Sequence, residues 1–249
     1  MEQIYLPSIH STNAWMQEQL PMQAWDEGTL VYTSYQTNGR GQLSNTWESE
    51  ADKNILISMY FAPTWLPVKE QFVLSQAVAL GVVDFLSQYA TGFQIKWPND
   101  IYWHHQKIAG ILIEQNLVGS SIASSIVGIG LNINQQRFLS DAPNPVSLYQ
   151  IIQKEVAWKE ALPGLQTALM NRYKQAQTHP QKVQEDYAAA LYLNKQWANY
   201  RDENGTFQGR IDLVEPRGYL HIVDSEGYDR KYAFKEVQFL LDKNLQDSV

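Results

Sequence analysis

The stretch KWPNDIYWHHQKIAGILIE, residues 96–114, contains the end of one apolar run, a proline break, a turn and a second apolar run. Pro98 cannot donate to a strand ladder, so Lys96 and Asp100 should bracket a sharp exit at the end of a sheet. A hairpin would return Lys107 towards Lys96. Each lysine alone is typical of a surface charge. Two lysines and an aspartate on one hairpin favour a site for a polyanion, with the carboxylate as a magnesium ligand.

Beyond this hairpin, the spacing of apolar residues divides the chain into two regions with different predicted secondary structure. Runs rich in β-branched and aromatic residues predict strands at residues 29–35, 54–61, 94–97, 110–114 and 121–134. Helical periodicity predicts helices at residues 69–89, 158–175 and 181–192. After Asn194 there are only short apolar runs between turn-like stretches, at residues 207–214, 219–223, 232–234 and 237–241. These patterns predict a first domain over residues 1–194 and a small all-β domain over residues 195–249.

Composition places the chain among ordinary globular proteins. Its 249 residues are 44% hydrophobic, enough to bury a sizeable core. A net charge of -7 and a pI of about 5.2 provide no diffuse cationic face, so we expect no nucleic acid partner. The absence of cysteine excludes disulfides and a cysteine nucleophile. No apolar stretch reaches the ~20 residues of a membrane span, and the N-terminus lacks signal-peptide features, so we expect no membrane contact and a cytoplasmic location.

Arg40 lies between Gly39 and Gly41 in an aperiodic segment, residues 36–47, which ends in Trp47. Glycine lets backbone amides approach an anion closely, and a guanidinium can bind two oxygens of a phosphate or carboxylate at once. The same residues are also typical of a solvated surface loop. This segment alone does not decide between the two interpretations.

Two further motifs are glycine-rich or polar where regular structure is expected. Gly128 and Gly130 alternate along a predicted strand, which weakens the strand unless a flat ligand ring lies against its backbone; a β-bulge is the other explanation. Residues 11–13, Ser-Thr-Asn, have the composition of a helix N-cap, and a helix start also offers amides and hydroxyls to a small polar group. The pair His104-His105 has no further histidine at ligand spacing, so we expect no zinc site.

Taken in order, these motifs resemble those of the biotin protein ligase family, from Ser11 to about Val237. The family shows Ser-Thr-Asn, Gly-Arg-Gly-x-x-Gly-x-x-Trp, Lys-Trp-Pro-Asn-Asp, Lys-x-x-Gly-Ile-Leu and Gly-x-Gly-x-Asn-x-Asn, and all but the second match here without exception. The second departs at Gln42, where many members have another arginine, and at Ser44, where glycine is common. Members that repress transcription carry a DNA-binding domain before Ser-Thr-Asn. Only ten residues precede Ser11, so we expect the short form without that domain.

The resemblance implies an α+β fold, in which a mixed-sheet catalytic domain of the biotin/lipoyl ligase type precedes a small SH3-like β-barrel. It implies an enzyme that uses ATP and Mg²⁺ to join biotin to AMP and then biotinylates a lysine of a biotin carboxyl carrier protein or domain. The implied catalytic residues are Lys96, Arg40, Lys107 and Asp100, and Asp100 is also the implied metal ligand.

The resemblance also implies a set of residues that bind biotin and ATP. These residues are Ser11, Thr12, Asn13, Gln36, Gly39, Arg40, Gly41, Gln42, Trp47, Lys107, Gly110, Gly128, Gly130 and Asn132. By analogy with the family, Ser11, Thr12 and Gln36 would hydrogen-bond the ureido ring of biotin. The carboxylate and phosphate fall to Arg40, Gly41 and Gln42, and the adenine to Trp47 and Asn132.

Two other functions stay open at this stage. A lipoate or octanoate ligase of related fold runs the same adenylation, although its loop usually has consecutive glycines, which are not seen here. A non-catalytic biotin or nucleotide sensor would keep the pocket without turnover, and the presence of Lys96, Asp100 and Lys107 argues against it. The sequence is compatible with a homodimer and does not identify the acceptor protein.

Overall fold

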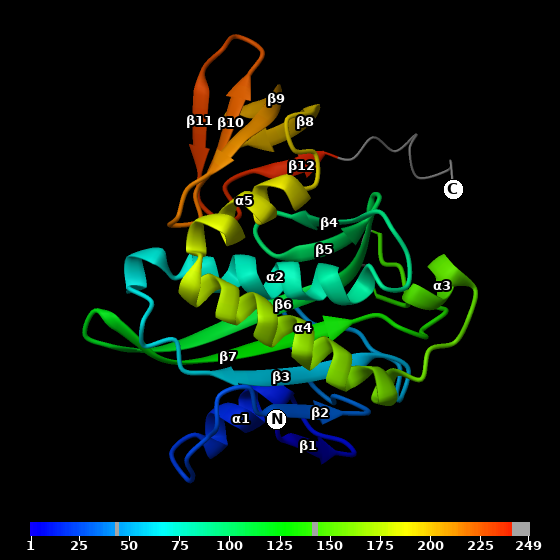
Figure 1. Cartoon of the computed structure of the whole chain (residues 1–249). Coiled ribbons are helices and arrows are strands. Elements are labelled where there is room, and N and C mark those ends of the chain that lie inside the picture. The colour runs from blue at the N-terminus through cyan, green and yellow to red at the C-terminus, as the bar shows by residue number, and fades with distance from the viewer. Residues whose placement is uncertain (43–44, 141–143, 241–249) are drawn as a thin grey trace.

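The computed structural model describes residues 1–42, 45–140 and 144–240, and these residues form two sheets and the helices packed on the larger sheet (Figure 1). Ser44 and position 241, which ends the last predicted apolar run, lie outside the described residues. The result is the expected α+β fold, with a mixed sheet followed by an antiparallel one.

Seven strands form the larger sheet, in the order β1-β2-β3-β7-β6-β5-β4. Their bounds are β1 Gln3–Leu6, β2 Leu30–Thr33, β3 Ile55–Phe61, β4 Phe93–Lys96, β5 Asp100–Trp103, β6 Gln106–Val118 and β7 Ser121–Leu131. β1 and β2 run parallel, and every other neighbouring pair is antiparallel. The longest strands, β6 and β7, therefore lie near the middle of the sheet, where both of their faces can be covered.

Helices cover both faces of this sheet. Their bounds are α1 Thr12–Gln19, α2 Phe72–Leu86, α3 Leu148–Ile152, α4 Trp158–Thr178 and α5 Pro180–Ala190, with a 3₁₀ turn at Val68–Glu70. Side chains alternate between the faces of a strand, and those of β7 sort accordingly: Val127 and Ile129 belong to the main core with α2, whereas Ile126 packs against Met16 of α1. Helix α1 thus lies on the opposite face from α2.

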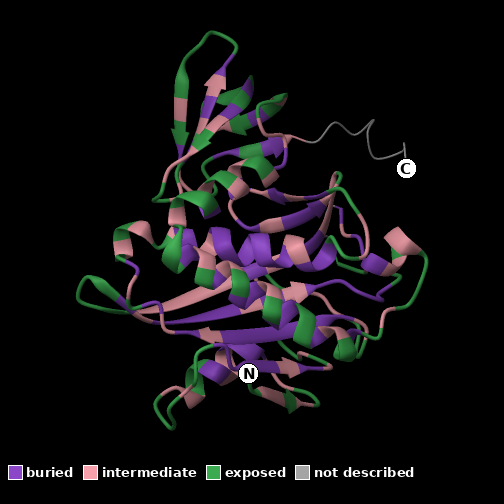
Figure 2. Cartoon of the chain, in the orientation of Figure 1, coloured by how far each residue is buried: buried purple, intermediate pink, exposed green. Residues whose placement is uncertain are grey.

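Helix α2 is buried along most of its length, as its apolar girth predicts (Figure 2). It packs against α4, and Gly81 permits the close approach, because a Cβ there would lie 3.0 Å from the Leu169 Cα of α4. No helix in the described part of the chain is both long enough and apolar enough to cross a membrane.

The smaller sheet forms a C-terminal module of five antiparallel strands in the order β11-β10-β9-β8-β12. The strands are β8 Trp197–Asp202, β9 Gly205–Val214, β10 Leu220–Asp224, β11 Asp229–Tyr232 and β12 Gln238–Leu240. Its core contains Tyr200, Ile211, Leu220 and Ile222, all fully buried. The texture change at Asn194 therefore precedes a new sheet, and the division into domains at that residue stays a prediction.

Four elements were not anticipated from the sequence, namely β1, β5, β8 and the short helix α3. Each has eight residues or fewer, too short for a clear period. Strand β5 is the one that matters for the site. It begins at Asp100, directly after the turn that follows β4, so Lys96 and Asp100 face each other across the β4–β5 pair.

Candidate active site

A cavity of about 1040 Å³ lies over the β6–β7 pair and is lined by residues from every predicted motif. The C-terminal module also contributes to it, through Phe234, Lys235 and residues 237–239. Among the predicted site residues, Gly39 alone does not line this cavity. Motifs that are separated by more than a hundred residues in sequence therefore share one chamber.

The floor of the cavity is backbone. Gly110 of β6 and Gly130 of β7 face each other in register, and Gly128 precedes Gly130 by two residues in β7. The register is continuous through these positions, so the β-bulge interpretation is wrong here. A Cβ on Gly110 would lie 2.8 Å from the Trp47 ring, and one on Gly130 would overlap that ring. The glycines are thus needed for close approach of a flat ring, which in this structure is the Trp47 indole.

The start of α1 forms a buried polar corner at one end of the cavity. Ser11 caps the helix by accepting from the Ala14 amide at 3.5 Å, as the N-cap interpretation predicts. Thr12 donates from its backbone amide to Gln36 Oε1 at 2.8 Å, and its hydroxyl accepts from Ser58 at 2.8 Å. Both Ser11 and Thr12 are only 3% exposed. The corner is therefore a preorganised set of neutral donors and acceptors.

The hairpin brings Lys107 to Asp100, whereas the sequence predicted a return towards Lys96. The Lys107 Nζ lies 2.7 Å from Asp100 Oδ1, and the same ammonium lies 5.8 Å from the centre of the Trp47 ring. The two charged side chains are each 32% exposed, so solvent weakens their attraction. Lys107 consequently faces the cavity as a carboxylate-paired cation.

Lys96 is held differently. Its Nζ donates to the Tyr102 hydroxyl at 3.1 Å and lies 5.4 Å from the centre of the Phe239 ring. Burial lowers the pKa of Lys96, and the nearby negative charge of Asp100 acts in the opposite direction. Burial also raises the pKa of Tyr102 to about 12, with Asp100 adding to the effect. Tyr102 therefore stays a neutral hydroxyl beside this ammonium at physiological pH.

The loop around Arg40 lines the cavity, although the Arg40 side chain itself is 44% exposed. The backbone of Trp47 donates to Gly39 at 3.0 Å, and that of Gly41 to Asn45 at 2.8 Å. The Arg40 guanidinium pairs with Glu114 at 2.8 Å. These contacts place a guanidinium and an indole along one side of the chamber.

Three residues that touch this loop or its neighbours were missed by the sequence analysis. Glu114 joins Arg40 to the polar corner, because its second oxygen accepts from Asn13 Nδ2 at 2.8 Å. Strand alternation places Glu114 on the same face as Gly110, so the sequence pattern could have indicated that Glu114 faces the cavity.

Asn99 accepts a hydrogen bond from Gln42 Nε2 at 3.1 Å. Phe239 comes from the C-terminal module, and no motif in its neighbourhood indicated that it would reach Lys96.

The carboxylates of the cavity do not form a resident metal centre. No group of three or more acidic, histidine or cysteine side chains comes together within residues 1–42, 45–140 and 144–240. Asp100 is the only predicted ligand, and it is engaged by Lys107. One carboxylate fits a Mg²⁺ ion that arrives on a nucleotide, because Mg²⁺ is commonly held by one or two carboxylates, waters and substrate phosphates.

The family model described as the biotin/lipoate A/B protein ligase family matches residues 5–132, which hold all of these motifs except the last two residues of Gly128–Asn134. The chain belongs to the biotin/lipoate A/B protein ligase family. Among relatives, the bifunctional ligase/repressor BirA of Bacillus subtilis is 32% identical over 218 residues, which cover 83% of this chain and 65% of that protein. The chain thus matches somewhat less than two thirds of the length of this relative.

Two further family members are similar over different extents. The biotin--[acetyl-CoA-carboxylase] ligase of Mycobacterium tuberculosis is 32% identical over 131 residues, 50% of this chain and 47% of that protein. The solved biotin protein ligase from Aquifex aeolicus, in complex with biotin and ATP, superposes with a TM-score of 0.74 at 24% identity, over 96% of this chain and 99% of that one. The two folds therefore agree over both sheets.

Proposed function

We propose that this member of the family is a biotin protein ligase, which forms biotinyl-AMP from biotin and ATP and then transfers biotin to a lysine of an acceptor protein. The observation that carries the proposal is the cavity itself, where a neutral polar corner, a backbone floor and the cations Arg40, Lys96 and Lys107 line one chamber. The relative from Mycobacterium tuberculosis and the solved protein from Aquifex aeolicus are both named as biotin ligases, which supports biotin as the acid.

The first step joins two anions that repel each other. A carboxylate oxygen of biotin attacks the α-phosphorus of ATP, and the bond to the oxygen that leads to the β-phosphate breaks, so pyrophosphate leaves. Lys96, Lys107 and Arg40 supply fixed positive charge where the negative charge grows. Asp100 would hold a Mg²⁺ ion that arrives with the nucleotide, and the ion would add to the neutralisation of phosphate charge.

The ends of the substrate are assigned by the chemistry of the lining. Ser11, Thr12 and Gln36 bind the neutral ureido ring, since they offer donors and acceptors without net charge. Trp47 and Asn132 bind the adenine. Asn132 is 3% exposed and its Oδ1 has no hydrogen-bond partner among the described residues, so it can accept from an exocyclic amine.

The remaining assigned residues shape the chamber around the reacting groups. Gly110 and Gly130 admit a flat ring to the floor, Gly128 leaves room for the Asn13 amide, and Gly39 and Gly41 set the backbone of the loop. Gln42 lies with Gly41 over the biotin carboxylate, and Asn13 steadies the polar corner through Glu114.

The second step requires mainly proximity. The deprotonated lysine amine of the acceptor attacks the acyl carbon of biotinyl-AMP, the amide bond forms, and the carbon–oxygen bond to AMP breaks. The acceptor is a biotin carboxyl carrier protein or domain. We place the reaction in the cytoplasm and assign catalysis to residues 1–194, with residues 195–249 as a second domain.

The experiment that tests the proposal is exchange of labelled pyrophosphate into ATP with purified protein. Exchange should depend on biotin and should not occur with lipoate or octanoate. Exchange with lipoate alone would make the chain a lipoate ligase, and no exchange with any acid would make it a sensor. Biotinylation of a carrier domain, with its acceptor lysine changed to arginine as the control, then tests the second step.

A further inference from the structure

We infer that Phe239, on β12 of the C-terminal module, is a positioning residue for the Lys96 ammonium, so that this module completes the adenylation site. The inference rests on the proposed biotin ligase activity. It assigns a part in the first step of the reaction to a module that holds none of the sequence motifs.

The contact joins two parts of the chain that are far apart in sequence. The Lys96 Nζ lies 5.4 Å from the centre of the Phe239 ring, within the ~6 Å reach of a cation–π interaction. Tyr102 meets the same ammonium through its hydroxyl oxygen, at 3.1 Å. The Tyr102 ring centre also lies 5.0 Å from this ammonium, so Tyr102 supplies a hydrogen-bond acceptor and a first ring, and Phe239 supplies a second ring from the C-terminal module.

An aromatic ring suits this position because it stabilises a cation without neutralising it. Asp100, the acid closest in sequence, is already engaged by Lys107 at 2.7 Å. No carboxylate lies within ion-pair distance of Lys96 in the described part of the chain. A ring offsets part of the desolvation of the ammonium, yet leaves its full charge free for a phosphate.

Phe239 is itself fixed by the core of the C-terminal module. It is 7% exposed, pairs with Tyr200 across β12 and β8, and meets the Tyr200 ring edge-on at 5.2 Å. The module also contacts the turn after Lys96, because Trp97 Nε1 donates to the Gly218 carbonyl at 3.0 Å and its ring lies edge-on to Phe234. Figure 1 shows β12 beside the β4–β5 end of the large sheet.

The test compares Phe239→Leu with Phe207→Leu in the full chain. Phe207 stacks on Tyr200 within the same aromatic cluster but has no contact with Lys96 among those described, so it controls for loss of packing. Biotin-dependent pyrophosphate exchange should fall roughly tenfold in kcat for Phe239→Leu, with the KM for biotin unchanged. Phe207→Leu should keep the wild-type kcat.

A second series separates the charge effect from shape. Replacing Phe239 with mono-, di- and trifluorinated phenylalanine keeps the ring in place while weakening its negative face, so kcat should fall stepwise with each fluorine. Equal kcat across this series, or equal losses in the two leucine variants, would overturn the positioning role. Absence of exchange in the wild-type protein would instead overturn the proposed function.

Discussion

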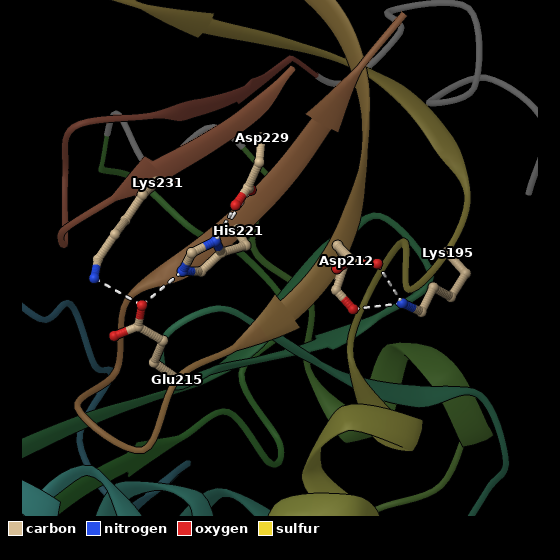
Figure 3. A network of polar contacts seen from close by, with 6 residues as sticks. All are labelled: Lys195, Asp212, Glu215, His221, Asp229 and Lys231. Atoms are coloured by element: carbon tan, nitrogen blue, oxygen red, sulfur yellow. Dashed lines mark hydrogen bonds and ion pairs between the residues drawn. The ribbon is translucent and has the colours of Figure 1, made fainter. Parts of the chain in front are cut away.

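The charged surface network of the C-terminal module and the Lys96 side of the cavity hold their charges in different ways. In the module, charged side chains neutralise one another at the surface: His221 lies between Glu215 at 2.8 Å and Asp229 at 2.9 Å, and Lys231 shares Glu215 at 2.7 Å (Figure 3). In the cavity, Trp47 Nε1 and Asn132 Oδ1 are buried without partners among the described residues, and the Lys96 ammonium is held by two aromatic rings and a hydroxyl.

The paired charges of the module satisfy one another, whereas the unpartnered cavity atoms are open to a ligand. A buried polar atom without a partner costs free energy, of about 1–3 kcal/mol, unless a ligand satisfies it. Of the seven buried side-chain atoms without a partner among the described residues, Trp47 Nε1 and Asn132 Oδ1 line the chamber of the predicted motifs, whereas the Tyr200 hydroxyl lies in the core of the module. Substitutions in the cavity should therefore change activity, whereas substitutions in the paired network should change mainly stability.

The largest effect should come from Lys96→Ala. Loss of this ammonium removes charge where phosphate charge develops, so pyrophosphate exchange should fall on the order of a hundredfold to a thousandfold. The Kd for biotin, measured by calorimetry, should change little, because the ureido ring lies at the polar corner. The exposed Lys174 of α4 provides the control as Lys174→Ala. Equal losses in exchange and in biotin binding would contradict the role of Lys96.

A smaller effect is expected from Gly130→Ala on the floor. The new methyl group would overlap the Trp47 ring, so a flat ring could no longer lie against β7. We expect the KM for ATP to rise about tenfold with the fold intact. Gly164→Ala is a matched control, since its Cβ would meet Phe85 at an ordinary 3.8 Å. In helix α4 this change should stabilise the protein by about 0.5–1 kcal/mol. A normal KM in Gly130→Ala would remove the glycine floor from nucleotide binding.

The smallest effect on activity is expected from His221→Gln in the paired network. Burial disfavours the imidazolium, but hydrogen bonds to Glu215 and Asp229 outweigh it and raise the pKa of His221. Since the folded-state pKa exceeds the unfolded value of about 6.5, this stabilisation is complete below that pH and is lost as pH rises through the folded-state pKa. The Tm difference between variant and wild type should be no more than about 4 °C, and larger at pH 5.5 than at pH 8.5.

Pyrophosphate exchange should be the same in wild type and His221→Gln at any one pH. Lys231→Met, which removes a different member of the same network, should lower the Tm without the dependence on His221 protonation. If His221→Gln abolished exchange, the network would belong to the reaction and the contrast between the two regions would fail.

Much of the fold could be predicted from local sequence patterns, whereas most of the lining residues were implied by the resemblance of the motifs to the biotin protein ligase family. Helix α2 is apolar on nearly every side and was predicted within three residues at each end. The lysine-rich hairpin was predicted from a proline and a turn, and Lys107 does pair with Asp100. The β-bulge at Gly128 was the alternative that the register excluded.

What escaped prediction depends on contacts between distant segments. Phe239 reaches Lys96 only because β12 packs beside β4, and a three-residue strand has no period to show which face it buries. Glu114 is the intermediate case. Its alternation with Gly110 was visible, but its two partners, Arg40 and Asn13, meet only after folding.

A floor made of glycine backbone also limits how the family can diverge. At Gly110, Gly128 and Gly130 a single added methyl group would collide with a neighbouring side chain. A residue larger than glycine is therefore disfavoured at these three positions. The backbone amides and carbonyls beneath a bound ring then stay the same when residues elsewhere in the chain are substituted. We therefore expect selectivity between carboxylic acids to depend on cavity residues that have side chains, such as Gln36 and Gln42.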